Sequence, residues 1–294
     1  MRLRIATRRS RLALAQAEEV AALLRARGHE AELVPMSTAG DRGASPASSP
    51  SGTKGLFVAE ITEAVLRGDA DLAVHSAKDL PSEDPEGVVV AAVPERNLPY
   101  DVLVTREEGA RSVVGTSSLR RRALYLRMDP AAEVRDLRGN VDTRLGLLRD
   151  GDVDAVILAA AGLDRLGLEP DHVSPLPTDE MVPAPGQGAL AVHTREGSDA
   201  AEAAGALDHP PSRVAFEAER RVVELLGGGC RLPLGAYAEW RGEAVRLLAV
   251  VVRPDGSDLL WAQVEAGRAD DAAGEAADVL RGAGAEGILE ELRA

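Results

Sequence analysis

Short apolar stretches alternate with longer amphipathic segments along the first two thirds of the chain. Residues 3–7 predict a strand, residues 12–27 repeat apolar positions at helical spacing until Gly28, and residues 32–36 predict a second strand. A strand–helix–strand unit therefore opens the fold. Continuing in this way, we expect a helix at 55–67 and strands at 70–75, 88–93 and 101–105.

The same alternation then begins again. Its expected elements are a strand at 112–115, a helix at 118–127, a strand at 132–137, a helix at 143–150 and a strand at 155–158. Strands that alternate with helices are typical of α/β domains with parallel-rich sheets. We therefore expect two α/β domains, the first made of residues 1–94 and 189–206 and the second of residues 100–183.

The last third has a different pattern. After a strand at 189–193, a helix is expected at 214–226, strands at 246–252 and 259–264, and a helix at the end. These elements predict a small α+β domain over residues 210–294. Residues 40–55 are rich in Gly, Ser and Pro and lack an apolar period, which predicts a mobile loop, either a plain insertion or a lid.

The composition limits the kind of core the chain can build and the compartment in which it is expected. Hydrophobic residues are 45% of the chain but aromatic ones only 2%, so the cores must consist of Ala, Val and Leu. The longest apolar run, 155–163, is too short to span a bilayer, and the first residues lack a signal-peptide pattern. One cysteine excludes an internal disulfide, and the histidines lack metal-ligand spacing. We expect a cytoplasmic protein without a membrane segment or a bound metal.

The charge is unevenly distributed. A net charge of −14 argues against broad nucleic-acid binding, which depends on neutralising phosphates. Basic residues nevertheless cluster in loops, and among 34 of them only Lys54 and Lys78 are lysines. An acidic protein with several cationic loops suits a small polyanionic ligand.

Three of these loops precede predicted helices: residues 7–10, 115–121 and 138–144. Helix N-termini carry partial positive charge, so arginines there are unfavourable unless an anion is bound. In open α/β sheets ligands bind at the carboxyl ends of the strands, where these loops lie. The guanidinium fork matches a carboxylate, so we expect a ligand with several acid groups.

Two further segments carry candidate chemistry. His75, Lys78 and Asp79 follow a strand, where Asp79 either stabilises a cation or serves as a helix cap, and where His75 suits a structural hydrogen bond. Cys230 follows three glycines and precedes Arg231, Leu232 and Pro233. It is either a small buried hydrophobe or a reactive thiol. Phosphate-binding and dinucleotide-binding glycine motifs are missing from the sequence.

Together these motifs resemble the porphobilinogen deaminase family, also called hydroxymethylbilane synthases. The matching segments are 4–8 (RIATR), 54–57 (KGLF), 73–76 (AVHS), 78–79 (KD), 114–121 (VGTSSLRR), 137–141 (LRGNV), 185–188 (PGQG) and 228–230 (GGC). The resemblance implies two periplasmic-binding-protein-like α/β domains around a cleft, and a third domain that carries the cysteine.

The resemblance also implies an activity. Such an enzyme is a transferase of tetrapyrrole and haem biosynthesis that joins four porphobilinogen molecules head to tail, with loss of ammonia, into hydroxymethylbilane. It implies a dipyrromethane cofactor attached to Cys230 through a thioether, on which the product chain grows. A monomer is implied as well, with hand-over of the product to a uroporphyrinogen III synthase.

Site roles follow from matching positions. The resemblance implies that Asp79 is the catalytic carboxylate, which stabilises the cation left by loss of ammonia. The residues implied to hold the cofactor, besides Cys230, are Lys78, Ser117, Ser118, Arg120, Arg121 and Arg144. Those implied to bind substrate are Arg8, Ser10, Gln16, Phe57, Arg138 and Arg165. Lys54, Thr116 and Gln187 are implied as further cleft or loop residues.

A few positions depart from the family pattern. Arg9 and Arg11 add charge to the first loop, Asp142 stands where glycine is common, and Arg231 stands where an amide is common. Two other functions remain open on the residues alone. A non-enzymatic anion-binding protein would leave Cys230 idle, and a thiol hydrolase or transferase would need a histidine near Cys230.

Overall fold

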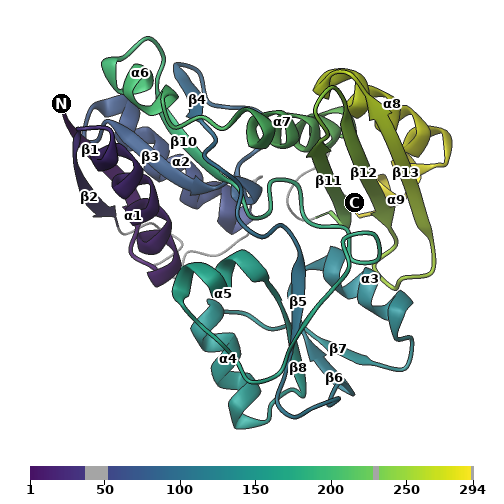
Figure 1. The fold of residues 1–294 in the computed structure, drawn as a ribbon. Coiled ribbons are helices and arrows are strands. Elements are labelled where there is room, and N and C mark those ends of the chain that lie inside the picture. Colours follow the sequence, from purple (N-terminus) through teal and green to yellow (C-terminus); the bar gives the residue numbers. More distant parts are fainter. Residues whose placement is uncertain (37–51, 228–231, 293–294) are drawn as a thin grey trace.

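The structure of the chain, a computed structural model, describes residues 1–36, 52–227 and 232–292, and for 52–57 it describes the backbone alone. These residues form two five-stranded sheets and one three-stranded sheet (Figure 1). The predicted fold class is confirmed, because two α/β units precede a small α+β unit. The loop predicted at 40–55 lies outside the described residues up to position 51, and a helix begins at Gly52.

The first lobe is built on the sheet ordered β2-β1-β3-β10-β4. Its strands are β1 (Arg2–Arg8), β2 (Glu30–Met36), β3 (Leu72–Ser76), β4 (Val88–Ala92) and β10 (Leu190–Arg195). Strand β10 runs antiparallel to β3 and β4, whereas β1 is parallel to β2 and β3. The helices α1 (Arg11–Ala26) and α6 (Asp199–Gly205) pack on one face and α2 (Gly52–Arg67) on the other.

The second lobe is built on the sheet ordered β7-β6-β8-β5-β9. Its strands are β5 (Asp101–Thr105), β6 (Val113–Gly115), β7 (Glu133–Arg135), β8 (Ala155–Ala159) and β9 (Val173–Pro175). Alternate residues of β5 and β8 face opposite sides, as the pleat requires. One face packs against α4 (Val141–Asp150) and α5 (Ala160–Leu166), and the other against α3 (Leu119–Met128).

The C-terminal unit is an antiparallel sheet covered by helices. Its elements are α7 (Pro210–Leu225), β11 (Leu234–Trp240), β12 (Val245–Val252), β13 (Leu259–Ala266), α8 (Ala269–Gly282) and α9 (Ala285–Glu291). Leu247 faces these helices, whereas Leu248 packs in a cluster with residues of the second lobe. Both faces of this small sheet are therefore buried.

The chain crosses between the lobes twice, at residues 93–100 and again at 176–189. Figure 1 shows the first lobe above the second, with the C-terminal unit beside the first lobe. None of the described helices is long and apolar enough to cross a membrane.

Candidate functional site

One cavity in the first lobe collects five of the predicted site residues. They are Arg8, Ser10, Gln16, Lys78 and Asp79, and His75 lines the same wall. The cavity lies where β1 and β3 end and α1 and the short 3₁₀ helix Ala77–Asp79 begin. The carboxyl ends of adjacent parallel strands thus bring a carboxylate, an ammonium and a guanidinium into one space.

Local structure explains the place of Ser10. Its backbone is extended and its Oγ accepts a hydrogen bond from the Ala13 N–H at 3.3 Å, so it caps α1. Ser118 and Asn140 cap α3 and α4 in the same way. The three cationic loops are therefore helix N-termini, as the sequence predicted.

Gln187 connects this cavity to the second lobe. Gly186 and Gly188 beside it have φ of 74° and 85°, a conformation that favours glycine. Gly186 lets the backbone approach Ala77, and Gly188 lets it approach Asn97. The Gln187 Oε1 lies 3.4 Å from the Lys78 Nζ and 3.5 Å from the Arg121 Nη2. Its Nε2 donates to the Asp101 Oδ1 at 2.9 Å.

Arg120 and Arg121 are buried, and both pair with Asp101. The Arg120 Nη2 lies 2.8 Å from Asp101 Oδ2, and the Arg121 Nη2 lies 2.7 Å from Asp101 Oδ1. Burial opposes ionisation of Asp101, but the charges of Arg121 and Arg120 outweigh it and lower the pKa of this carboxyl. Burial also lowers the pKa of Arg120.

This cluster keeps an excess of positive charge. Among the described residues, Asp101 is the one acidic partner of both guanidinium groups, and the Arg120 Nε is buried without a hydrogen-bond partner there. Two cations therefore share one carboxylate. Guanidinium and hydroxyl donors suit carboxylate oxygens, so this donor set fits a ligand with several acid groups, as a dipyrromethane has.

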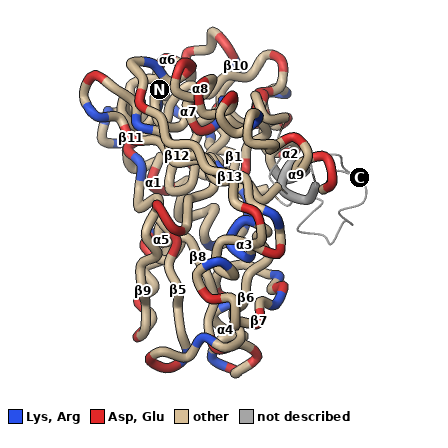
Figure 2. The backbone as a smooth tube through the Cα atoms, turned by 90° about the vertical axis from the view of Figure 1, so that its right-hand side faces the viewer, with Lys and Arg blue, Asp and Glu red and all other residues tan. Residues whose placement is uncertain are grey.

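The loops before α3 and α4 meet at Arg144. Its Nη2 donates to the Ser117 Oγ at 2.9 Å and its Nε to the Gly139 carbonyl at 3.1 Å. Burial, followed by the nearby charge of Arg121, lowers the pKa of Arg144. Figure 2 shows basic segments gathered at α3 in the middle of the molecule. Arg138 belongs to the same loop, but its side chain is 85% exposed.

Arg165 lies apart from the cavity. Its side chain is 5% exposed, its Nε lies 2.7 Å from Glu19 Oε2, and its Nη2 donates to the Gly188 carbonyl. It therefore joins α5 to α1 across the two lobes. Cys230 and Arg231 lie outside the described residues, and so do the side chains of Lys54 and Phe57.

Asp101 was not among the site residues predicted from the sequence. It opens the apolar strand β5 and is fully buried. A lone acidic residue at the start of an otherwise apolar strand was the available signal, because a buried carboxylate needs cationic partners.

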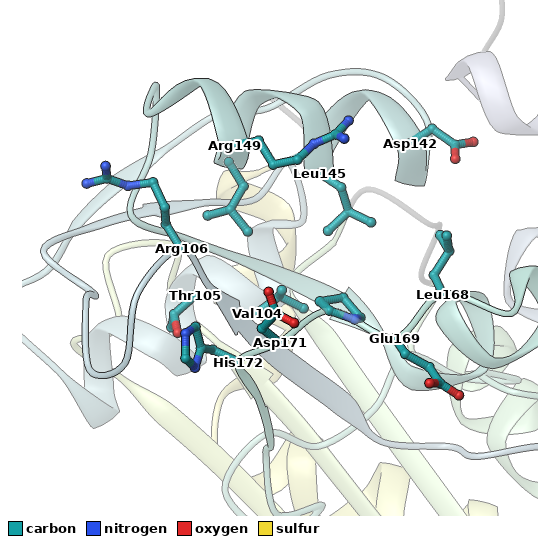
Figure 3. A pocket seen from close by; sticks show the side chains of 12 residues that line it. Val104, Thr105, Arg106, Asp142, Leu145, Arg149, Leu168, Glu169, Asp171 and His172 are labelled. Atoms are coloured by element: carbon teal, nitrogen blue, oxygen red, sulfur yellow. The ribbon is translucent and has the colours of Figure 1, made fainter.

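A larger cavity of about 380 Å³ lies between α4 and the residues before β9 (Figure 3). Val104, Leu145, Leu148 and Leu168 form much of its wall, and none of the predicted site residues lines it. The larger cavity is also lined by charged side chains, but the smaller cavity is the better candidate because it brings together Arg8, Lys78 and Asp79, which the sequence predicted as site residues. The described residues contain no cluster of His, Cys, Asp and Glu that would hold a metal ion.

Comparison with known proteins identifies the family. The family model "Porphobilinogen deaminase, dipyromethane cofactor binding domain" matches residues 3–203, and "Porphobilinogen deaminase, C-terminal domain" matches residues 214–280. A porphobilinogen deaminase of Rubrobacter xylanophilus is 46% identical, with 98% of this chain and 96% of that protein covered. That of Thermus thermophilus is 45% identical, with 89% and 88% covered.

Solved structures resemble the chain more distantly. YhfZ from Shigella flexneri aligns with a TM-score of 0.37 and 21% identity, covering 76% of this chain and 90% of that one. An ancestral cationic amino acid solute-binding protein aligns with a TM-score of 0.44 and 14% identity, covering 70% and 87%. From the family models and the curated relatives, the chain belongs to the porphobilinogen deaminase family.

Proposed function

We propose that this transferase condenses four porphobilinogen molecules head to tail, with release of ammonia, into hydroxymethylbilane for tetrapyrrole biosynthesis. The observation that carries the proposal is the path of polar groups from Asp79 and Lys78 through Gln187 to Arg121. A carboxylate that can stabilise a cation thus lies next to a cluster with excess positive charge. Porphobilinogen, with its amine and its two acid arms, needs both.

We infer that Asp79 acts at the reacting pyrrole. Loss of ammonia leaves a cationic, electron-poor ring, and a fixed carboxylate stabilises such charge as it develops. The same carboxylate can accept hydrogen bonds from pyrrole N–H groups and take up the proton that the attacking ring carbon loses. Arg8 and Lys78 line the same cavity and bring positive charge close to this carboxylate.

The family model that matches the first 200 or so residues is the cofactor-binding domain, and we propose Cys230 as the covalent attachment point. When bound, the dipyrromethane supplies the nucleophilic ring carbon onto which the product chain grows. Lys78, Ser117, Ser118, Arg120, Arg121 and Arg144 would hold its acid arms. Residues 228–231 join α7 to β11, so the cysteine belongs to the C-terminal unit.

Substrate binding is proposed for Arg8, Ser10, Gln16, Phe57, Arg138 and Arg165. The first three line the cavity beside Asp79, whereas the exposed Arg138 side chain lies 3.7 Å from Asp136 Oδ2. Arg165 can bind a substrate carboxylate by exchanging it for Glu19. In such an exchange the buried arginine keeps a carboxylate partner, so no buried charge is left unpaired.

Intact-protein mass spectrometry and kinetics test this function. Purified active enzyme should exceed its sequence mass by two linked pyrrole units, and Cys230→Ala should remove the excess. Asp79→Glu should retain the added mass but turn over at least about 100-fold more slowly, as loss of a well-placed acid–base group does. An unmodified thiol in active enzyme would refute the attachment, and normal turnover of Asp79→Glu would refute the catalytic role.

We further propose that residues 1–94 with 189–206, residues 100–183 and residues 210–294 are the three domains. We also infer a cytoplasmic monomer that passes its product to a uroporphyrinogen III synthase. Light scattering after size-exclusion chromatography tests the monomer. A faster overall conversion in a mixture of the two enzymes than their separate rates predict would support the hand-over.

A further inference from the structure

Two buried histidines beside the candidate cavity have no part in the function proposed so far. His75 on β3 is 7% exposed and lines the cavity, and His193 on β10 is fully buried. Their rings meet edge to face with centroids 5.1 Å apart. Buried polar rings need hydrogen-bond partners, which determine which ring nitrogen carries the proton.

A continuous chain of contacts runs from the C-terminal unit to His75. Arg220 on α7 binds both oxygens of Asp84, at 2.8 and 3.0 Å. Asp84 Oδ1 lies 3.0 Å from the His193 Nε2. The Thr62 Oγ1 on α2 lies 3.5 Å from the His193 Nδ1 and 3.5 Å from the His75 Nε2.

The ionised carboxylate of Asp84 determines which atom donates and which accepts at each hydrogen bond in this series. Partial burial opposes ionisation of Asp84, but hydrogen bonds from His193 and Arg220 lower the pKa of this carboxyl. A carboxylate only accepts, so the His193 Nε2 must donate, and in the neutral ring Nδ1 accepts from the Thr62 hydroxyl. The Thr62 oxygen can then accept from the His75 Nε2–H. In His75 the remaining nitrogen, Nδ1, is left as an acceptor.

The surroundings keep His75 neutral. Burial, and next the neighbouring His193, lower the pKa of His75 to about 3, although Asp79 and Asp84 favour its protonation. Arg8 and Lys78 line the same cavity and disfavour another cation there. A neutral acceptor suits a ligand that brings N–H donors.

We propose that Thr62, His193 and Asp84 are positioning residues that hold His75 as a neutral hydrogen-bond acceptor for an N–H group of the substrate. The role rests on the proposed function, since porphobilinogen carries a pyrrole N–H and an aminomethyl group. The bond from His75 would fix the orientation of the ring relative to Asp79. Arg220, at which this series of contacts begins, lies on α7, the helix that precedes Cys230 in the sequence.

Nitrogen-15 NMR of histidine-labelled enzyme, combined with kinetics, tests the proposal. Both rings should be Nε2–H tautomers at pH 8. Thr62→Val removes one hydroxyl of a residue that is 1% exposed, and should give His75 a mixture of tautomers and lower kcat/KM about two- to tenfold, the effect of one hydrogen bond. Thr62→Ser should restore both properties.

Thr194→Val is the matched control. Thr194 is also fully buried, but its Oγ1 has no hydrogen-bond partner within the described chain, so tautomers and kcat/KM should stay as in the parent enzyme. An Nδ1–H tautomer of His75 in the parent enzyme would overturn the proposal. So would a Thr62→Val enzyme with parental kcat/KM, or one that Thr62→Ser fails to rescue. Absence of porphobilinogen turnover by the parent enzyme would instead refute the proposed function, and the tautomers would still be measurable.

Discussion

The interfaces made by the C-terminal unit differ from the contact between the two lobes. Leu248, Val250 and Val252 of β12 share one buried apolar cluster with Tyr125 and Met181 of the second lobe. Phe216 of α7 packs in another buried cluster with residues of the first lobe. Between the lobes, by contrast, lie the ion pairs Arg11–Asp142 and Arg165–Glu19.

This difference indicates which units of the molecule can move at a low cost in free energy. Separating apolar surfaces costs about 25 cal/mol for each Å² exposed to water. An exposed ion pair such as Arg11–Asp142, by contrast, can exchange its partner for water or for a ligand carboxylate. We therefore expect the C-terminal unit to stay fixed against both lobes. The lobes themselves can change their separation as the product chain grows.

Among the contacts that fix the C-terminal unit against the lobes, we expect those of Glu219 to be the most sensitive to substitution. It is fully buried on α7, pairs with Arg96 at 2.7 Å and accepts from the Gly186 and Ala238 N–H groups. It thus joins both crossing segments to β11. Glu219→Ala leaves a buried arginine unpaired, so the free energy of unfolding should fall by about 3–5 kcal/mol in urea titrations.

The control for this change lies on the same helix. The Glu217 side chain is 53% exposed, so Glu217→Ala should shift the urea midpoint far less. Equal shifts for the two variants would contradict a special role of Glu219 at the junction.

Adjacent leucines of β12 separate interface from core. Leu248→Ala empties space against the second lobe and Leu247→Ala within the C-terminal unit, and each should lower the free energy of unfolding by about 2–5 kcal/mol. If the interface is what couples the units, calorimetry should show two transitions for Leu248→Ala and one for Leu247→Ala. A single transition for both would show that the units unfold together without this contact.

The sequence predicted most elements, including the three-residue strands β6 and β7. Strand β5 was predicted with the observed bounds, and most others within a few residues. The elements α5, α6, β9 and β11 were missed, and one terminal helix was predicted where α8 and α9 lie. Helix α5 continues the apolar run of β8, so no polar break separates them, and β9 is an exposed edge of three residues whose pairing with β5 no local pattern predicts.

The site likewise contains residues that could be predicted from the sequence and residues that could not. Local motifs brought Arg8, Ser10 and Asp79 to one cavity, because helix starts and strand ends can be read from a short window. Partners distant in the sequence were not predictable from such windows. Asp101 beside Arg121, and Glu19 beside Arg165, come together only when sheets and lobes are assembled.

The pH dependence of stability probes the buried cavity wall. Because the pKa of His75 falls to about 3 in the folded protein, the unfolded chain binds a proton below pH 6.5 that the folded protein does not. Stability should therefore fall as the pH falls from 6.5 toward 3, by up to about 1.4 kcal/mol per pH unit from this group. His75→Gln should flatten that slope in urea titrations.

Above pH 7.5 the two proteins should have parallel stability profiles, since His75 is then neutral in both states. An unchanged slope between pH 6 and pH 4 in His75→Gln would contradict the lowered pKa and place the acid sensitivity in other groups.

The smallest effect should come from the lobe contact. Arg11 and Asp142, two departures from the family pattern, pair across the cleft with side chains 62% and 37% exposed. A double-mutant cycle with Arg11→Gln and Asp142→Asn should give a coupling of about 0.2–1 kcal/mol at low salt. The coupling should vanish near 1 M salt, where charges are screened within about 3 Å.

The pair Glu18–Arg25, which lies within α1, separates lobe contact from ordinary surface charge. Its cycle should give a similar coupling, but only Asp142→Asn should change the distance between labels placed on the two lobes. If the label distance in Asp142→Asn is the same as in the variants of the Glu18–Arg25 pair, the Arg11–Asp142 pair does not hold the lobes together. The contact between the lobes would then depend on the Arg165–Glu19 pair, whose buried arginine would make separation of the lobes more costly.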